Sequence, residues 1–512
     1  MLLVGVVLSS GWIDWPRLGQ WSGRRAPWLA AFAAAAMFAG VGGWTWWWKS
    51  KQPPRRRAPG LSWWTVVAAG VVVGVVAWGA TSWLLTEANS ANDRGAARVD
   101  AIKTGLGIGA GTTGIFALLL AVRRQTHQEH TAADISLDAT ERRVTELYTK
   151  AVEQLGSAKA PVRLGGLYAL ERLGESHEDQ RSTIINVICA YLRMRYAWPA
   201  EPADDATPEQ LDRYEDRLQE NQVRVTAQRI LSRHRDMWTE RLFWRQITID
   251  LTEANLRNVV LARTDLVGAT LIRANLANAD LTDAFLNDAQ LIRANLADAT
   301  LTKTRLSDAD LTGVDLTSAN LTNARLARAN LTEAIFTDAE LTGATLIDAK
   351  LNNADFTSSG LLRADMTKAS LRSTDLSQAR LNDADLTEAV LIDANLTDAR
   401  LIRAQLTNAD LTVAQLVRAN LTNADLTNAD LTRANLAGAD LTDADLTDAN
   451  LTLADLTDAN LTNTNLDHAG LSGAILTGAC VTDATRIRLP PHYEVRDNKV
   501  VMKSTSGDAD HA

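Results

Sequence analysis

Residues 421–460 read LTNADLTNADLTRANLAGADLTDADLTDANLTLADLTDAN, and the same five-residue pattern runs from about Asp250 to Val481. In steps of five from Leu251, 43 of 47 positions are Leu. Two residues before these positions, between 254 and 479, 39 of 46 residues are Ala. A period of five fits neither the 3.6-residue repeat of a helix nor the two-residue repeat of a strand. The pattern predicts a chain that turns a corner every five residues and points Leu and Ala inward.

The exceptions to the pattern are few. The Leu position holds Phe336, Phe356, Met366 and Val481 instead. The region 353–374 departs most, and it also places other small residues where Ala is usual. It is a candidate for a bulge or a contact site, but we favour ordinary substitutions of compatible volume.

Two copies of the segment LIRANL, at 271–276 and 291–296, lie twenty residues apart. This spacing indicates four pentapeptides per coil, with each coil burying a face of its neighbour. The units Ala439-Asp440-Leu441-Thr442 and Ala444-Asp445-Leu446-Thr447 resemble pentapeptide-repeat proteins. The resemblance implies a mainly β fold, a right-handed quadrilateral β-helix over 250–484. About 12 coils at ~4.8 Å each make a rod of roughly 55 Å.

The cysteines indicate the redox compartment of the protein, and the charged residues are unevenly distributed along the chain. Cys189 and Cys480 lie far apart in sequence, which is typical of a reducing compartment and argues against a disulfide framework. The chain has a net charge of −9, with 32 acidic and 17 basic residues in 251–484. Within this region the net charge falls from −1 over 251–330 to −6 over 331–410 and −8 over 411–484. Acidity therefore concentrates at the far end of the predicted rod.

The N-terminal region predicts a membrane anchor over 26–124. Its three apolar segments, at about 26–48, 61–85 and 104–122, are each long enough to cross a ~30 Å hydrocarbon core. Trp residues gather at the ends of the first two, as in the aromatic belts of membrane proteins. The segment 1–25 precedes them, and Met1–Trp15 could be a signal sequence or a fourth span.

Basic residues indicate which side of the membrane the rod occupies. A Lys/Arg-rich loop separates the first two spans, and Arg123-Arg124 follows the third. Both should face the cytoplasm, which predicts a multi-pass protein of the inner membrane with a cytoplasmic repeat domain. If 104–122 did not cross, the rod would lie outside. Gly70-x-x-x-Gly74 and Gly105-x-x-x-Gly109 could pack helices into an oligomer, although lipid-facing helices explain them equally well.

Residues 125–249 are predicted to be a helical connector and N-terminal cap. Apolar periodicity and end signals predict helices over 137–155, 161–174, 182–196 and 207–234, with a linker at 199–206. The string ERRVTELYTKAVEQLG…APVRLGGLYALERL resembles membrane-anchored bacterial pentapeptide-repeat proteins. After the repeats, 485–512 is predicted to form a hairpin cap and a disordered tail.

Motifs for chemistry are missing from the sequence. It has no phosphate-binding loop, no GxSxG elbow and no dinucleotide fingerprint, that is, no GxGxxG that follows a predicted strand. His127 and His130 form an HxxH without metal-protease spacing, and Cys189 lies on an apolar helix face that predicts core packing. We therefore predict no catalytic, cofactor-binding or metal-binding residues and no enzyme activity.

Three functions fit these observations, in decreasing order of support. The first is a non-catalytic, membrane-tethered scaffold for unidentified cytoplasmic proteins, with no direct nucleic acid binding. The second follows from the resemblance, because some pentapeptide-repeat proteins imitate duplex DNA and bind DNA gyrase. The rod's net charge is about half that of DNA of equal length. The third is an uncharacterised enzyme. The candidate interaction surface comprises Asp440, Asp443, Asp445, Asp448, Asp455 and Asp458.

Overall fold

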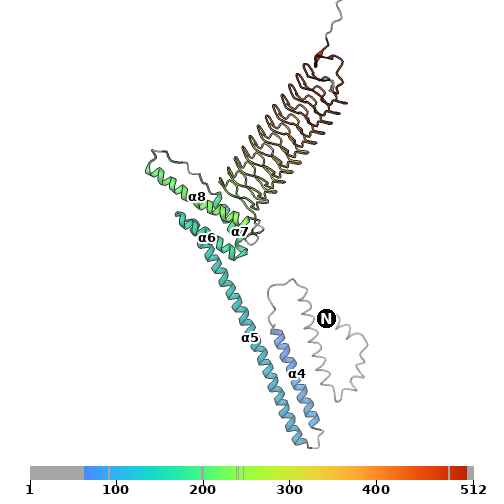
Figure 1. The fold of residues 1–512 in the computed structure, drawn as a ribbon. Helices are drawn as coiled ribbons and strands as arrows, with labels where there is room; N and C mark the ends of the chain where they lie inside the picture. Colours follow the sequence, from blue (N-terminus) through green and yellow to red (C-terminus); the bar gives the residue numbers. More distant parts are fainter. Residues whose placement is uncertain are drawn as a thin grey trace, which may run out of the picture. The chain divides into compact units, whose positions relative to one another are not determined.

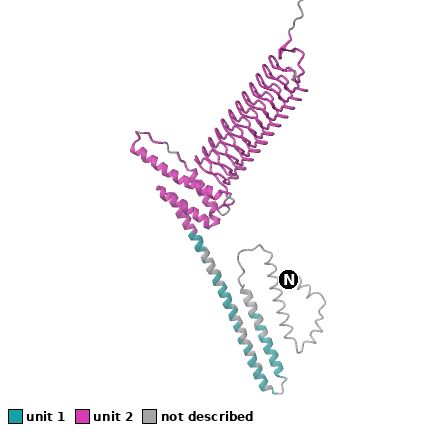
Figure 2. Cartoon of the chain, in the orientation of Figure 1, with its two compact units in different colours: residues 1–143 teal, residues 144–512 magenta. Residues whose placement is uncertain are grey.

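The structure is a computed structural model. It describes residues 63–503 except 90–92, 198–200, 204, 238, 240–241, 246 and 483–484. The chain divides into two compact units, Met1–Arg143 and Val144–Ala512 (Figure 2). The predicted span 26–48, the segment Met1–Trp15 and the predicted disordered tail therefore lie outside the described residues.

The described part of the first unit consists mainly of α4, Trp63–Ala88, and the larger part of α5, Arg94–Leu155, whose last residues belong to the second unit. The predicted spans 61–85 and 104–122 fall largely or wholly on these helices. Among the described residues, no helix combines the length and the apolar character needed to cross a membrane. The transmembrane anchor therefore stays a prediction from the sequence. A Cβ atom added to Gly74 would meet no atom within 4 Å, so no described residue packs closely against that glycine.

Helix α5 differs from the sequence analysis in its continuity. We predicted a span ending near Arg124 and a separate helix over 137–155, whereas α5 is a single helix of 62 residues. The reason is local, because residues 115–155 contain no Gly or Pro to end a helix.

The cap of the rod is a small helical bundle in the second unit (Figure 1). It contains α6, Ala160–Ser176, a 3₁₀ turn, Glu178–Gln180, and helices α7, Arg181–Arg193, and α8, Pro208–Arg235. The predicted start of α8 is confirmed, since Thr207 and Gln210 form a reciprocal capping box ahead of Pro208. Cys189 is buried, and burial raises the pKa of its thiol to about 12, which confirms its assignment to the core.

The repeats form the stacked coils that the spacing predicts (Figure 1). Residues twenty apart pair as parallel bridges along the whole rod, from Asp250 with Thr270 to Asn460 with Cys480. All the Leu positions and nearly all the preceding small positions are buried. Four pentapeptides per coil are thus confirmed, and the core is a column of Leu and Ala that requires neither metal nor disulfide.

Each corner of the coil is a β-turn that begins at the inward Leu. The backbone N–H of Ala254 donates to the carbonyl of Leu251, and Glu253 between them has a φ of 59°. The same left-handed residue recurs every five positions, where Asp, Asn, Arg and Gly are common. Asp and Asn suit such turns because their short side chains tolerate positive φ.

The region 353–374 keeps the regular coil geometry, which confirms ordinary substitutions over a bulge. The rings of Phe336 and Phe356, one coil apart, stack with centroids 4.3 Å apart and an angle of 5° between planes. Both rings are fully buried. Two adjacent Phe residues thus fill the space that two stacked Leu residues fill elsewhere.

Both ends of the rod are covered. At the first coil, the carbonyl of Arg235 accepts from Asp265 N, and the Arg235 guanidinium donates to the Trp244 carbonyl and the Asp265 carboxylate, each at 2.6 Å. At the last coil, the hairpin of β1, Tyr493–Arg496, and β2, Lys499–Met502, pairs antiparallel with residues around Cys480. The predicted hairpin cap is confirmed.

Two buried hydroxyl groups in the rod should affect its stability in opposite ways when they are removed. The Ser359 Oγ is buried and has no hydrogen-bond partner, whereas Thr374 Oγ1 donates to the Leu351 carbonyl at 2.9 Å. Because an unsatisfied buried polar group costs about 1–3 kcal/mol, Ser359→Ala should raise the free energy of unfolding by about 1 kcal/mol. Thr374→Ala should lower it by roughly 0.5–1.5 kcal/mol. Denaturant titration of both variants checks this, and a loss of stability in Ser359→Ala would contradict it.

Candidate functional site

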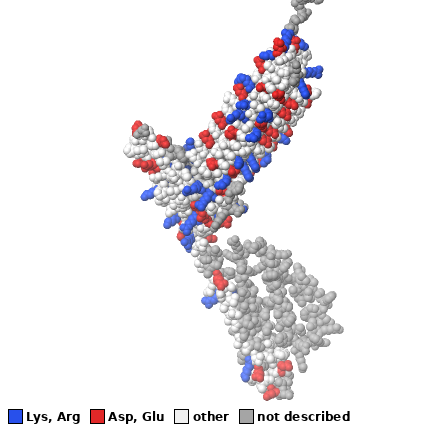
Figure 3. All heavy atoms as spheres, viewed as in Figure 1, with Lys and Arg blue, Asp and Glu red and all other residues white. Residues whose placement is uncertain are grey.

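The outer surface of the rod has four faces, numbered here in chain order. A pentapeptide is taken here as the inward Leu with the two residues before it and the two after it. The first face contains the pentapeptides of Leu251, Leu271 and every twentieth residue onward. The second, third and fourth faces begin in the same way with the pentapeptides of Leu256, Leu261 and Leu266. The second and fourth faces lie on opposite sides of the coil. Figure 3 shows that acidic and basic side chains interleave along the visible side of the rod.

Charge is divided unequally among these faces. The first has seven acidic and five basic residues, and the third has seven acidic and six basic. The second has eight acidic and two basic residues, and the fourth has eleven acidic and four basic. The acidic residues of the fourth face are Asp265, Asp288, Asp308, Asp348, Asp365, Asp385, Glu388, Asp425, Asp445, Asp448 and Asp467. The rod's negative charge therefore belongs mainly to two opposite faces.

The structure does not gather the six predicted interaction residues into one patch. Asp440 and Asp443 lie on the third face, Asp445 and Asp448 on the fourth, and Asp455 and Asp458 on the second, by the register of the coils. A partner on one flat face could contact only two of the six. Residues that are close in sequence do not share a face here, because five residues correspond to a quarter turn of the coil.

The six residues also divide into two chemical classes. Asp440, Asp445 and Asp455 are half-buried, and one carboxylate oxygen of each accepts from the backbone N–H two residues ahead, for example from Thr442 at 3.1 Å to Asp440. Asn460 extends the network by donating to Asp440 at 3.1 Å. This class supports the coil through Asx turns. The other three, at the left-handed corner position, are exposed to solvent, and Asp443 also accepts from the Asn463 side chain at 3.1 Å.

Many corner residues form ion pairs with the next coil. Arg328 pairs with Asp308, Arg403 with Asp383 and Arg418 with Asp398, each across one coil spacing. The hydrogen bond from the arginine holds the pKa of each of these carboxyls below its ordinary value. These pairs are exposed and contribute little to stability, but they remove negative charge from the surface that a partner meets.

The far half of the fourth face keeps most of its negative charge. Between residues 365 and 448 its only basic residue is Lys368, which pairs with Glu388 at 3.6 Å. We call this region the distal acidic face. It consists of Asp365, Asp385, Glu388, Asp425, Asp445 and Asp448. Of the predicted six, it retains Asp445 and Asp448.

A hollow of about 550 Å³ lies at the start of α8, away from the rod's faces. Arg213, Tyr214 and Arg217 line it, together with Thr207 and Gln210. The last two are committed to the capping box, and the hollow brings together no nucleophile with a general base. Nothing in the described residues indicates catalysis.

Sequence patterns gave no signal for one cluster of potential metal ligands. Glu171, Glu175 and His234 converge in the cap, although 63 residues separate Glu171 from His234. The hydrogen bond to His234 lowers the pKa of Glu171 below its ordinary value, against the opposing effect of burial. The side chains of His127 and His130, the only pair that a motif suggested, lie outside the described residues.

The chain belongs to the pentapeptide-repeat family. The model of that family matches it in successive segments that together run from residue 249 to residue 485. No curated protein sequence matches the chain. The family assignment agrees with the coil geometry, and it extends to neither the helical cap nor the residues before it.

Several solved pentapeptide-repeat structures are similar. HetL, involved in heterocyst differentiation regulation in the cyanobacterium Nostoc sp. strain PCC 7120, is 35% identical, with 42% of this chain and 91% of that chain covered and a TM-score of 0.19. A thylakoid-lumen protein of Arabidopsis thaliana is 34% identical, with 20% and 68% covered and a TM-score of 0.10. QnrB1, a plasmid-mediated fluoroquinolone resistance protein, is 20% identical, with 34% and 86% covered and a TM-score of 0.19.

Proposed function

We propose that this protein is a non-catalytic interaction scaffold tethered to the inner membrane, whose rod presents its outer faces to a protein in the cytoplasm. The observation that carries the proposal is that the rod has a filled core and two covered ends. Its inward positions are filled by Leu and Ala, and its two ends are covered by α8 and the hairpin. The flat outer faces are the surface left for recognition. The tether rests on the Trp-flanked apolar segments of the sequence.

The distal acidic face is the part of this surface best suited to a partner. Its side chains recur at a fixed spacing on a rigid support, so little entropy is lost when they bind. Negative charge that basic residues do not neutralise favours a partner with a basic surface and speeds their encounter. Such binding should weaken as salt is added, because these groups are exposed to solvent.

The proposal predicts loss of the partner when the distal acidic face is neutralised. Full-length protein captured from membranes is compared with a variant carrying Asp385→Asn, Glu388→Gln, Asp425→Asn, Asp445→Asn and Asp448→Asn. Asn keeps the oxygen that accepts in the Asx turn, so the coils should remain folded. Quantitative mass spectrometry should show at least a tenfold loss of the specific partner.

A matched control removes five carboxylates from the first face by Asp310→Asn, Glu333→Gln, Asp393→Asn, Asp410→Asn and Asp430→Asn. It removes the same number of charges from the same rod and should retain the partner. Equal loss in both variants would show that total charge, rather than one face, governs binding. Identical partners for the full-length protein and a chain ending at residue 245 would refute the scaffold role of the rod.

The alternative, a DNA-like binder of DNA gyrase, receives less support from the arrangement of charge. DNA carries one charge per ~1.7 Å of its axis, distributed around the helix. Here the first and third faces are nearly balanced, and corner arginines pair with several of the acids. Inhibition of gyrase supercoiling by the purified protein at a modest molar ratio would favour this alternative over the scaffold.

A further inference from the structure

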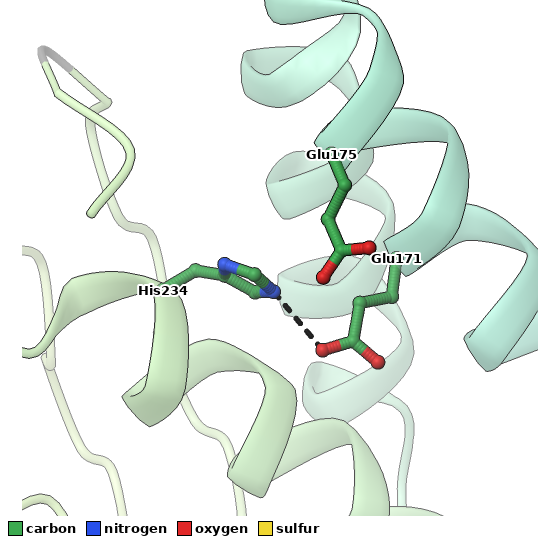
Figure 4. Close-up of side chains that lie close together, drawn as sticks. All are labelled: Glu171, Glu175 and His234. Atoms are coloured by element: carbon green, nitrogen blue, oxygen red, sulfur yellow. Dashed lines mark hydrogen bonds and ion pairs between the residues drawn. The ribbon is translucent and has the colours of Figure 1, made fainter. Parts of the chain in front are cut away.

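Three side chains with metal-binding atoms meet inside the helical cap (Figure 4). Glu171 and Glu175 lie one turn apart on α6, and His234 belongs to the last turn of α8. One ligand atom from each residue lies within 4.8 Å of the other two. Residues four apart on a helix share one face, so both carboxylates are directed toward the same imidazole.

The hydrogen bonds of His234 define the state of its ring. The ring is fully buried, and its Nδ1 lies 2.9 Å from the carbonyl oxygen of Leu242, which can only accept. Nδ1 must therefore carry a hydrogen. In the neutral ring, Nε2 then presents a lone pair to the Oε1 of Glu171 at 3.0 Å. Two lone pairs at this distance repel, so a cation must lie between them, either a proton or a metal ion.

Two features favour a metal ion over a proton alone. A histidine that binds a metal usually donates its other ring N–H to a carbonyl or carboxylate, as His234 does to Leu242. Glu175 adds a second carboxylate to a pair that a proton would already satisfy. At i and i+4, the carboxylates of Glu171 and Glu175 repel each other, and a divalent cation converts this repulsion into attraction.

The surroundings are compatible with a bound cation. Two donors about 2.0–2.2 Å from a tetrahedral zinc ion lie roughly 3.4 Å apart, so His234 Nε2 and Glu171 Oε1, which are 3.0 Å apart, need to separate only slightly to hold the ion. Arg233 also reaches Glu171 Oε1, at 3.5 Å, but its side chain is 55% exposed and can turn into solvent. Trp244 stacks on the His234 ring at 4.1 Å and holds its orientation.

We propose that Glu171, Glu175 and His234 form a binding site for a divalent transition metal, with Zn²⁺ the best fit. One imidazole with two carboxylates suits zinc better than magnesium or calcium, which prefer oxygen ligands alone. Water can complete the coordination from the exposed side of Glu175. The ion joins α6 to the end of α8, and the next residue, Arg235, contacts the first coil. The site therefore serves to hold α6 against the end of α8, beside the residue that contacts the rod.

The test uses the purified full-length protein after chelator treatment, titrated with Zn²⁺ alone in a calorimeter. We expect one equivalent to bind and the midpoint of thermal unfolding of the cap to rise. Glu175→Gln removes a ligand but leaves Glu171 and His234 unchanged, and it should weaken zinc binding at least tenfold. Glu153→Gln, a change at an exposed glutamate of α5, should bind zinc as the unchanged protein does.

Cobalt provides a second measurement that does not depend on stability. Co²⁺ bound at this site should give visible absorption bands of a nitrogen- and oxygen-ligated ion, and His234→Ala should abolish them. Failure of the unchanged protein to bind zinc stoichiometrically would overturn the proposal. Equal zinc affinity in Glu175→Gln and the unchanged protein would overturn it as well, because the ion would then bind elsewhere.

Discussion

A chain that ends at Leu489, and so lacks the C-terminal hairpin, should form a dimer through its exposed last coil. The hairpin presently satisfies the N–H groups of Gly478 and Val481 and buries Val500 completely. Its pairing with the last coil is antiparallel, so the freed edge can accept the same edge of a second copy. Size-exclusion chromatography with light scattering on residues 144–489 and 144–512 should give a dimer and a monomer, respectively.

The expected assembly stops at two copies because the other end of the rod stays covered by α8. A two-fold contact of identical edges closes on itself, whereas a head-to-tail contact would give filaments. Val500→Asp in the full unit should expel the hairpin and give the same dimer. Met502→Asp, at an exposed position of the same strand, should leave the protein monomeric. A monomeric truncated chain would show that the hairpin is not needed to protect this edge.

The largest loss of stability from a single substitution is expected for Phe356→Ala. It leaves a cavity against the stacked ring of Phe336 in a fully buried column, and Phe→Ala changes in cores cost about 3–5 kcal/mol. Each coil contacts only its neighbours, so the damage should stay local. Hydrogen exchange with mass spectrometry should show lost protection in the adjoining coils, and denaturant titration should show the lower stability.

Phe356→Leu is the matched control for this cavity. Leu occupies 43 of the 47 equivalent positions, and a substitution between apolar residues of similar volume costs less than about 1.5 kcal/mol. Most of the protection should therefore return. If Phe356→Leu were as damaging as Phe356→Ala, ring stacking rather than filled volume would hold these coils together.

The fold of the repeats could be predicted because one physical requirement recurs. Leu at every fifth position and Ala two residues before it have no place in a helix or a flat sheet, and LIRANL at 271–276 and 291–296 revealed the coil period. The caps were also readable from local signals. Thr207 with Pro208 predicted the start of a helix, and Asp497-Asn498 predicted the turn of a hairpin. Both turn residues have positive φ in the structure.

The candidate sites could not be predicted in the same way, because they depend on which residues share a surface. Asp440 and Asp455 are near in sequence but lie on different faces, whereas Asp385 and Asp445 share the fourth face across sixty residues. The cluster around His234 depends on the packing of α6 against α8, and no spacing motif encodes that packing. Net charge per segment therefore described the acidic end of the rod but not its acidic sides.

The pairing of residues twenty apart also limits how a gene for this rod can change in length. Deleting one pentapeptide would rotate everything beyond it by a quarter turn, so that columns of the fourth face would continue on the third. Gain or loss of twenty residues, by contrast, lengthens or shortens the rod by one rung of ~4.8 Å and leaves each face continuous. Duplication of whole coils can therefore change the length of the rod beyond its cap without changing the arrangement of side chains that a partner contacts.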